Sequence, residues 1–305
     1  MSRTGIIYGI NGPVIYLKGD TGFKMSEMVY VGEEKLVGEV ISLDKDQTTI
    51  QVYEETSGLR PGEVVEASGE AVSVTLAPGI LDNIFDGIER PLERIAENAG
   101  AFITRGISVD SLDRQKLWDT HITVAEGDVL HGGDIIAEVP ETRAIVHKCM
   151  IPPDVTGTVV SAVEDGKYTI HDTLVTLELS DGTTRDITMT QRWPIRVPRP
   201  AHDRIPASVP LITGQRILDT MFPIAKGGTA AIPGGFGTGK TMTQHQIAKW
   251  SDADIIIYIG CGERGNEMTQ VLEEFQELVD PKSGNPLMDR TVLIANTSNM
   301  PVAAR

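Results

Sequence analysis

Eight consecutive residues in the second half of the chain carry the clearest chemistry. The run Gly234-Gly235-Phe236-Gly237-Thr238-Gly239-Lys240-Thr241 fits the spacing G-x-x-x-x-G-K-[ST]. In this pattern small residues let consecutive backbone N–H groups surround a phosphate, the lysine reaches the β- and γ-phosphates, and the hydroxyl ligates Mg²⁺. The run therefore predicts a site for ATP or ADP in which Lys240 offsets phosphate charge and Thr241 is the Mg²⁺ ligand.

The residues that flank this loop favour the same interpretation. Thr229 to Ile232 is predicted as a short apolar strand before the loop, and Thr241 to Trp250 as a helix after it, with Ile247, Ala248 and Trp250 as its apolar positions. A bound phosphate would then lie at a helix N-terminus, where unpaired N–H groups and the helix dipole favour negative charge. The alternative, a glycine-rich turn with an exposed lysine, does not require this order of elements.

A second candidate follows the predicted strand Ile255 to Ile259, which leads into Gly260-Cys261-Gly262-Glu263-Arg264-Gly265. We predict that Glu263 orients the water that attacks the γ-phosphate, with Arg264 beside it. The alternative is that Glu263 caps the next helix and Arg264 forms a surface ion pair. The surrounding glycines favour the first role because they let the backbone approach a ligand closely.

The elements around these residues predict a doubly wound core. Helix Asn266 to Leu278 places Met268, Val271 and Phe275 on one face, and a further strand, Thr291 to Ala295, follows. Strands that alternate with helices form a parallel sheet whose site lies at the carboxyl edge. We find no aspartate for Mg²⁺ at the end of an apolar strand of this core.

The whole chain is expected to be multidomain. Residues 1–69 read as a small β-barrel, residues 109–191 as a β-rich insertion, and residues 70–108 with 192–305 as a discontinuous P-loop α/β core of RecA-like type, incomplete at its C-terminus. The repeated turn-and-strand units of the insertion are similar to those of a lipoyl or biotinyl module, in which Lys148 would be the attachment site. Because Pro152-Pro153 follow and no Met-Lys-Met hairpin is present, we favour an unmodified structural module.

Composition limits the partners. Asp and Glu outnumber Lys and Arg by 43 to 27, and the net charge of -16 would repel a nucleic-acid backbone. Aromatic residues are only 5% of the chain, too few for a base-stacking platform. Cys149 and Cys261 match no metal-ligand spacing, and no apolar run approaches the ~20 residues that span a bilayer. We therefore expect a cytosolic chain without a nucleic-acid partner.

The motifs resemble those of a known family. The segments 222–233, 234–241, 250–253 and 260–268 are similar to the catalytic A subunit of archaeal (A-type) and vacuolar (V-type) rotary ATPases, over essentially the whole chain. Two loop positions depart from the usual archaeal pattern, since Gly235 stands where proline is common and Thr238 where serine is common. A glycine in place of proline loosens the unliganded loop, so nucleotide affinity is the property affected.

The resemblance implies a function, partners and a location. It implies an ATP-binding catalytic chain that alternates with B subunits in an A3B3 hexamer, contacts central and peripheral stalk subunits, and couples ATP synthesis or hydrolysis to proton or sodium translocation. It also implies a peripheral location at the cytoplasmic face of the membrane, where the chain contacts the membrane only through the ion-translocating sector. Lys240, Thr241 and Glu263 take the family's lysine, Mg²⁺-ligand and catalytic-glutamate roles.

The sequence is also compatible with two other functions. Family members extend beyond Arg305, so we expect a truncated catalytic chain that is inactive in isolation, which makes a non-catalytic nucleotide-binding fragment one alternative. A Rho-like hexameric nucleic-acid motor is the other, and the charge disfavours it.

Overall fold

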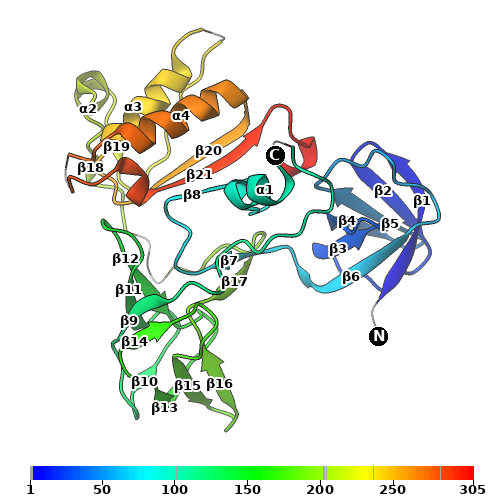
Figure 1. The fold of residues 1–305 in the computed structure, drawn as a ribbon, viewed down its shortest axis with the longest axis horizontal. Coiled ribbons are helices and arrows are strands. Elements are labelled where there is room, and N and C mark those ends of the chain that lie inside the picture. The colour runs from blue at the N-terminus through cyan, green and yellow to red at the C-terminus, as the bar shows by residue number, and fades with distance from the viewer. Residues whose placement is uncertain (1–2, 101, 202, 204, 236, 282) are drawn as a thin grey trace.

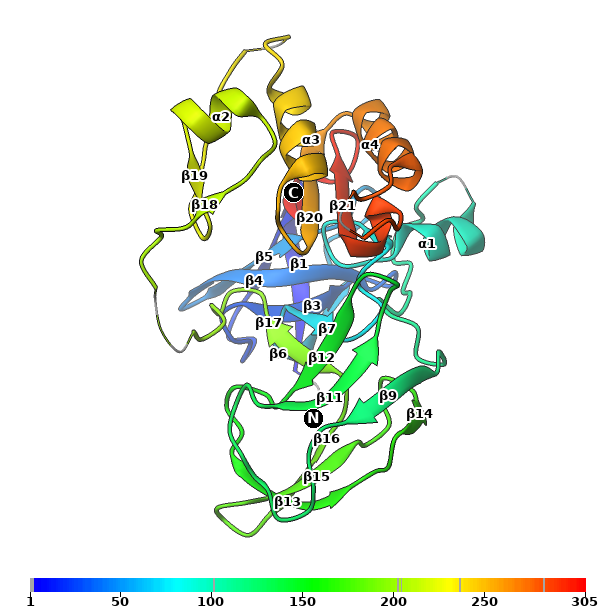
Figure 2. The ribbon, with the colours of Figure 1, turned by 90° about the vertical axis from the view of Figure 1, so that its left-hand side faces the viewer.

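The computed structural model describes residues 3–100, 102–201, 203, 205–235, 237–281 and 283–305. These residues form three parts (Figure 1): a barrel at the N-terminal end, a β-rich insertion, and an α/β part that contains most of the helices. In the view turned by 90° (Figure 2), the insertion lies below the α/β part, and the barrel lies behind both. The C-terminal end lies between the barrel and the α/β part (Figure 1).

The barrel is closed and antiparallel. Its strand order is β1-β2-β5-β4-β3-β6. The strands are β1 (Thr4–Asn11), β2 (Val14–Lys18), β3 (Glu27–Val31), β4 (Leu36–Asp44), β5 (Gln47–Val52) and β6 (Val64–Ala71). Alternate side chains such as Ile15, Leu17, Val29 and Val31 point inward and are fully buried. The predicted barrel is thus confirmed, although β6, which is polar and contains Gly69, was not recognised because pairing with β1 and β3 specifies it.

The insertion consists of two four-stranded sheets that share one core. One sheet has the order β10-β13-β15-β16 and the other β12-β11-β9-β14. The strands are β9 (Trp118–Ile122), β10 (Val129–Leu130), β11 (Ile135–Pro140), β12 (Val146–Met150), β13 (Gly157–Ala162), β14 (Gly166–Tyr168), β15 (Val175–Leu179) and β16 (Thr184–Ile187). Ile136, Val159 and Leu177 belong to the common core. Lys148 is exposed within β12, opposite Glu138, and not in a turn.

A pair of antiparallel strands joins the insertion to the rest of the chain. These are β7 (Ser73–Leu76), before the insertion, and β17 (Gln191–Pro194), after it, with Leu76 opposite Gln191. The chain therefore leaves and returns at one place. The linker that follows is tied to the barrel, because the guanidinium of Arg196 donates to both carboxylate oxygens of Glu39, at 3.0 and 2.7 Å.

The α/β part is built on a parallel sheet of order β20-β21-β8. Its elements are β8 (Asn83–Phe85), α1 (Leu92–Ala99), β18 (Pro210–Leu211), α2 (Arg216–Met221), β19 (Ile224–Ala225), α3 (Lys240–Trp250), β20 (Ile256–Glu263), α4 (Gly265–Glu277), β21 (Thr291–Thr297) and two short 3-10 helices, Leu287–Arg290 and Val302–Ala304. Met268, Val271 and Phe275 of α4 are buried, and Val271 and Phe275 share a core with Ile256 and Leu293 of the sheet. The predicted amphipathic face of this helix is thus confirmed.

One predicted strand does not form. Residues 229–232 are irregular, and Thr229, Ala230 and Ala231 are exposed. An extended segment becomes a strand only when a neighbour pairs with its backbone, and among the described residues β20 pairs only with β21. Among the described residues, the other edge of β20 is therefore unpaired. On the face of β20 that is turned away from the helices, the side chains of Ile257 and Ile259 are 62% and 59% exposed.

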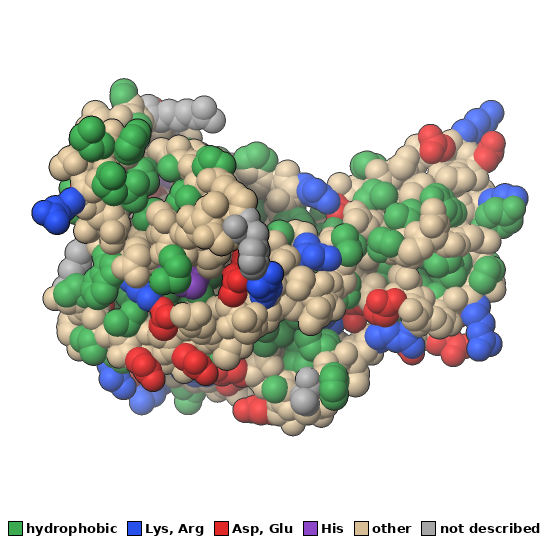
Figure 3. Space-filling model, turned by 90° about the horizontal axis from the view of Figure 1, so that it is seen from above, with side chains coloured by type: hydrophobic (Ala, Val, Ile, Leu, Met, Phe, Trp, Pro, Cys, Tyr) green, Lys and Arg blue, Asp and Glu red, His purple; other side chains and the backbone are tan. Residues whose placement is uncertain are grey.

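Apolar side chains also gather at the surface around α2. This helix buries no side chain, and Ile217, Met221 and Phe222 are each about two thirds exposed. In the view from above (Figure 3), hydrophobic side chains collect at this end of the molecule. Among the described residues, no helix is both long and apolar enough to cross a bilayer.

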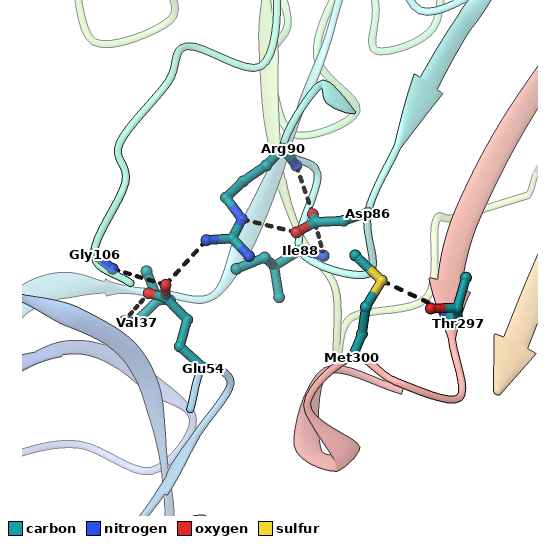
Figure 4. Close-up of polar contacts among 8 residues, drawn as sticks. All are labelled: Val37, Glu54, Asp86, Ile88, Arg90, Gly106, Thr297 and Met300. Atoms are coloured by element: carbon teal, nitrogen blue, oxygen red, sulfur yellow. Dashed lines mark hydrogen bonds and ion pairs between the residues drawn. The ribbon is translucent and has the colours of Figure 1, made fainter. Parts of the chain in front are cut away.

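A buried ion network connects the barrel to the sheet (Figure 4). Asp86, directly after β8, accepts hydrogen bonds from the backbone N–H groups of Ile88 and Arg90 at 3.0 and 2.8 Å. Glu54 lies two residues after the barrel strand β5. It accepts hydrogen bonds from the backbone N–H groups of Val37 and Gly106 at 3.1 and 2.9 Å. The side chain of Arg90 lies between the two carboxylates and bonds to both.

Candidate nucleotide-binding edge

The glycine-rich loop has the backbone conformation that its sequence requires. Gly237 and Gly239 have φ angles of 76° and 84°, which L side chains rarely adopt. The hydroxyl of Thr238 donates to the carbonyl of Gly235 at 2.9 Å, and a Cβ at Gly234 would lie 2.3 Å from that hydroxyl oxygen. Glycine is therefore favoured at positions 237 and 239 by the backbone conformation and at position 234 by lack of space. The predicted site residue Phe236 lies outside the described residues.

Helix α3 begins where the loop ends. Gly239 is its N-cap, Lys240 its first residue, and no acidic side chain lies in its first turn. The N-cap makes no side-chain hydrogen bond, so the first N–H groups of the helix are available to an anion. Lys240 is exposed and Thr241 is half-buried beside it. The predicted helix is confirmed, with its start one residue earlier than expected.

The buried face of α3 differs from the predicted one. Trp250, expected as an apolar position, is 43% exposed, and the side chains that α3 buries are His245 and Lys249. Lys249 forms an ion pair with Glu274 of α4. The inward side of the helix is therefore partly polar, although Ala248, one of the predicted apolar positions, does pack against the core shared by β20 and α4.

A bulge at the end of β20 sets the direction of Glu263. Along β20, Tyr258 and Gly260 face the helices while Ile259 and Cys261 are exposed. Gly262, with φ of 78°, occupies the bulge, so that Cys261 pairs with Asn296 and Glu263 with Thr297. A bulge shifts the alternation of side chains by one residue. Glu263 thereby lies on the helix face of the strand, where an uninterrupted strand would place it on the opposite face.

Gly260 serves the packing of the next helix. A Cβ at this position would lie 2.2 Å from the sulfur of Met268. Glycine therefore lets α4 lie against β20, and this contact fixes the residues that follow Glu263.

The charges at this edge interact with one another. The pKa of Glu263 is raised by a hydrogen bond with the carboxyl group of Glu267, then by burial and by the charge of Glu267. The nearby charges of Lys240 and Arg264 act in the opposite direction. Burial, together with the charges of Glu263 and Glu267, raises the pKa of Tyr258 to about 12. The loop lysine and the strand glutamate, far apart in sequence, thus lie at one edge.

The capping alternative for Glu263 does not match the geometry. The N-cap of α4 is Arg264, and no side chain caps this helix by a hydrogen bond. The acidic residue in the first turn of α4 is Glu267. Glu263 therefore stands outside the helix, with its carboxyl group beside Glu267 and near Lys240.

Three residues at or near this edge were not recognised in the sequence. Glu267 is four residues after Glu263, a spacing that could have indicated the pair. His245 is buried on α3, and the sequence pattern did not indicate that this position faces inward. Asp86 follows a sheet strand, as a Mg²⁺ aspartate would, but its strand has only three residues, and Arg90 and two N–H groups occupy its oxygens.

This geometry defines a class of protein. A glycine-rich turn that opens a helix, beside the carboxyl edge of a parallel sheet that carries a glutamate, is typical of P-loop nucleotide-binding proteins. The family is more specific: the ATP synthase alpha/beta family beta-barrel domain matches residues 7–69, the ATP synthase alpha/beta subunit barrel-sandwich domain residues 109–196, and the family's nucleotide-binding domain residues 214–305. The chain belongs to the ATP synthase alpha/beta family.

Individual relatives are similar over the whole chain. It is 60% identical over 304 residues to the V-type ATP synthase alpha chain 2 of Clostridium tetani. It is 57% identical over 305 residues to the V-type ATP synthase alpha chain of Halothermothrix orenii, and 56% identical over 304 residues to the A subunit of the A-type ATP synthase of Methanopyrus kandleri. Each comparison covers 100% of this chain and 51–52% of the relative. The chain thus spans about half the length of the curated relatives it matches.

Proposed function

We propose that the chain provides the ATP-binding catalytic part of a rotary A/V-type ATP synthase, which couples ATP synthesis or hydrolysis to ion translocation. The observation that carries this proposal is the electrostatic proximity of Lys240, which opens α3, to Glu263, which ends β20. A cation for the phosphates and a carboxylate for the attacking water are the two groups that phosphoryl transfer needs at one place.

Each part of the edge has a chemical role in this proposal. Residues 234–241 surround the β- and γ-phosphates with backbone N–H groups, and the ammonium of Lys240 offsets their charge. The hydroxyl of Thr241 fits Mg²⁺, which commonly takes one or two protein oxygens together with phosphate oxygens and water. When bound, Mg²⁺ would neutralise charge that develops on the phosphate oxygens. Ionised Glu263 accepts a hydrogen bond from the attacking water and orients it, with Arg264 beside it.

The surface supports assembly with other subunits. The relatives are named as chains or subunits of ATP synthases. Apolar side chains are exposed on α2 and along β20, and contiguous apolar surface is typical of interaction sites. We propose B subunits in an A3B3 hexamer and the stalk subunits as partners, at the cytoplasmic face of the membrane. We also propose a domain division at residues 1–69, 109–191, and 70–108 with 192–305.

Two variants of the assembled enzyme test the proposal. Lys240→Ala should lose about 10²- to 10³-fold in ATPase rate, because it removes one charge-stabilising contact. Glu263→Gln keeps the size of the side chain but cannot carry its charge, so nucleotide should still bind while turnover falls by about 10²- to 10⁴-fold. Gln244→Ala, which removes an exposed side chain of α3, is the matched control. Near-normal ATPase activity of the Lys240→Ala enzyme contradicts the assignment.

The isolated chain should bind nucleotide without sustained turnover. Every described residue from Gly234 to Lys240 is exposed, so bulk water reaches the loop. Electrostatic stabilisation of phosphoryl transfer is weaker in an open, hydrated site than in a closed one. A phosphate-release assay at saturating Mg-ATP, with Lys240→Ala as background, checks this. Multiple turnovers above that background would show that the 305 residues suffice.

A further inference from the structure

The bulge at the end of β20 is a weak point of the strand that carries Glu263. Strand β21 provides a paired residue for Cys261 and for Glu263 but none for Gly262 between them. A bulged residue is left out of the hydrogen-bond ladder, and a glycine has no side chain with which to pack. The direction of the Glu263 side chain therefore depends on contacts that hold the bulge from outside the strand.

The segment that follows β21 makes contacts with all three of these residues. The backbone N–H of Ser298 donates to the carbonyl oxygen of Glu263 at 2.8 Å. The thiol of Cys261 donates to the carbonyl oxygen of Arg305 at 3.2 Å. The side chain of Arg305 lies beside Gly262, where a Cβ would be 3.1 Å from Nη1 and 3.4 Å from Cδ of the arginine. Arg305 thus contacts the bulge through both its backbone and its side chain.

Arg305 approaches the bulge from the face of the sheet that is turned away from the helices. Cys261, which bonds to its carbonyl, is exposed on that face. On the helix side, Gly260 leaves the space in which Met268 of α4 lies against the strand. The end of β20 is therefore held between α4 on one face and Arg305 on the other.

The backbone that carries Arg305 is itself packed against the turn after β8. A Cβ at Gly87 would lie 2.7 Å from the carbonyl oxygen of Ala304 and 2.5 Å from Nδ2 of Asn296, so glycine is favoured there by lack of space. Gly87 directly follows Asp86 of the buried ion network. Figure 1 shows this last segment of the chain between the barrel and the α/β part. The segment is thus supported on the side away from the bulge as well.

We propose that Arg305 is a positioning residue for the candidate nucleotide-binding edge: it holds the bulge of β20 and so keeps the carboxylate of Glu263 directed at the attacking water. The inference rests on the proposed function. Arg305 acts through Glu263 and does not itself bind the nucleotide. Loss of its side chain should leave nucleotide binding by the loop intact but lower turnover, since a misplacement of about 1 Å can cost about 10²-fold in rate.

Steady-state kinetics of the assembled enzyme test this role. Arg305→Ala should lower kcat about 10- to 100-fold and leave KM within about twofold of its normal value. Arg305→Lys keeps a long stem and the charge, so it should retain most of the kcat. Val302→Ala, in the same segment and 68% exposed, is the matched control and should have normal kinetics. A normal kcat in Arg305→Ala, or a raised KM at normal kcat, overturns the proposal.

A double-mutant cycle separates positioning from a direct contact with the substrate. If Arg305 acts only through Glu263, Arg305→Ala should have no further effect on the residual turnover of Glu263→Gln. The same loss in both backgrounds would show that Arg305 acts independently, which contradicts the inference. If Glu263→Gln turns over normally, the proposed function and the inference fail together. If Glu263→Gln is impaired but Arg305→Ala is normal, the inference alone fails.

Thiol labelling of the 305-residue chain measures the contact itself. Cys261 is exposed, whereas Cys149 is 2% exposed and burial raises the pKa of its thiol to about 12, so an aromatic disulfide reacts with Cys261 first. Without the Arg305 side chain beside Gly262, the segment should open more often and expose the thiol. Labelling should therefore be about three- to tenfold faster in Arg305→Ala than in Val302→Ala or the unaltered chain. Equal rates in the three chains would show that Arg305 does not hold the bulge.

Discussion

The guanidinium of Arg90 lies between Asp86 and Glu54, with Nε 2.7 Å from Oδ2 of Asp86 and Nη1 3.0 Å from Oε2 of Glu54. Asp86 follows a strand of the parallel sheet and Glu54 follows a strand of the barrel. The three side chains are 12%, 3% and 5% exposed, so the bridge is largely shielded from water. The side chain of Arg90 thus connects the barrel to the sheet that carries the candidate nucleotide-binding edge.

Arg90→Ala should therefore be strongly destabilising. It leaves two buried carboxylates without their cation, and breaking a buried pair in this way costs about 3–5 kcal/mol. Arg105→Ala is the control, because the Arg105–Glu34 pair also reaches the barrel but is 34% and 46% exposed, and exposed pairs contribute about 0–1 kcal/mol. Urea unfolding of the three chains measures the difference. Equal midpoints for the two variants would contradict the role given to Arg90.

Gly262→Ala should disturb the bulge that directs Glu263. At φ of 78° a side chain is strained, and the cost is about 1 kcal/mol or more of unfolding free energy. Gly265→Ala, three residues later, meets no atom within 4 Å and lies in the first turn of α4, so it should be neutral or stabilising. Thermal unfolding distinguishes the two. In the assembled enzyme Gly262→Ala should also lower turnover, whereas Gly265→Ala should not.

Gly235→Ala should tighten nucleotide binding. A Cβ at Gly235 meets no atom within 4 Å, and its φ is not in the left-handed region. Restricting the free loop is worth about 0.4–1 kcal/mol, or roughly two- to fivefold in affinity. Gly237→Ala should act in the opposite direction, because its φ of 76° strains any side chain. Titration with a fluorescent ADP analogue compares them, and weaker binding by Gly235→Ala would contradict this view of the loop.

Glu89 should make stability depend on pH. Burial raises its pKa from 4.5 to about 7, although its carboxylate accepts a hydrogen bond from Thr75. The folded state thus holds a proton that the unfolded state releases, so the contribution to stability is full below pH 4.5 and is lost as pH rises to about 7. At about 1.4 kcal/mol per unit, the loss is a few kcal/mol. Glu89→Gln should remove this slope in unfolding measured from about pH 4 to 8, and an unchanged slope would contradict it.

The sequence predicted those elements whose side chains carry their own periodicity. Helix α4 and its buried face were expected because Met268, Val271 and Phe275 are spaced as on one helical side. The last residues of β20 were not expected as a strand, since Gly260-Cys261-Gly262 has low strand propensity and is extended by pairing with β21. The loop, Lys240 and Glu263 were found from the motifs, whereas the proximity of Lys240 to Glu263 depends on tertiary packing.

Contacts between distant segments account for what the sequence did not reveal. Strand β8 is too short to be recognised alone and exists because β21 pairs with it. The polar face of α3 depends on α4, which supplies Glu274 to Lys249. The segment 229–232 has strand-like residues, but none of the described strands pairs with it.

The order of the sheet also bears on how the protein is made. Asn83 of β8 pairs with Val292 of β21, so a strand that leaves the ribosome early must wait for a partner that is made much later. The barrel and the insertion, whose strands are close in sequence, can fold during synthesis, while β8 remains unpaired next to them. Non-local parallel pairing of this kind is slow and exposes the chain to aggregation. The nucleotide-binding part should therefore be the last to fold and the one most dependent on chaperones.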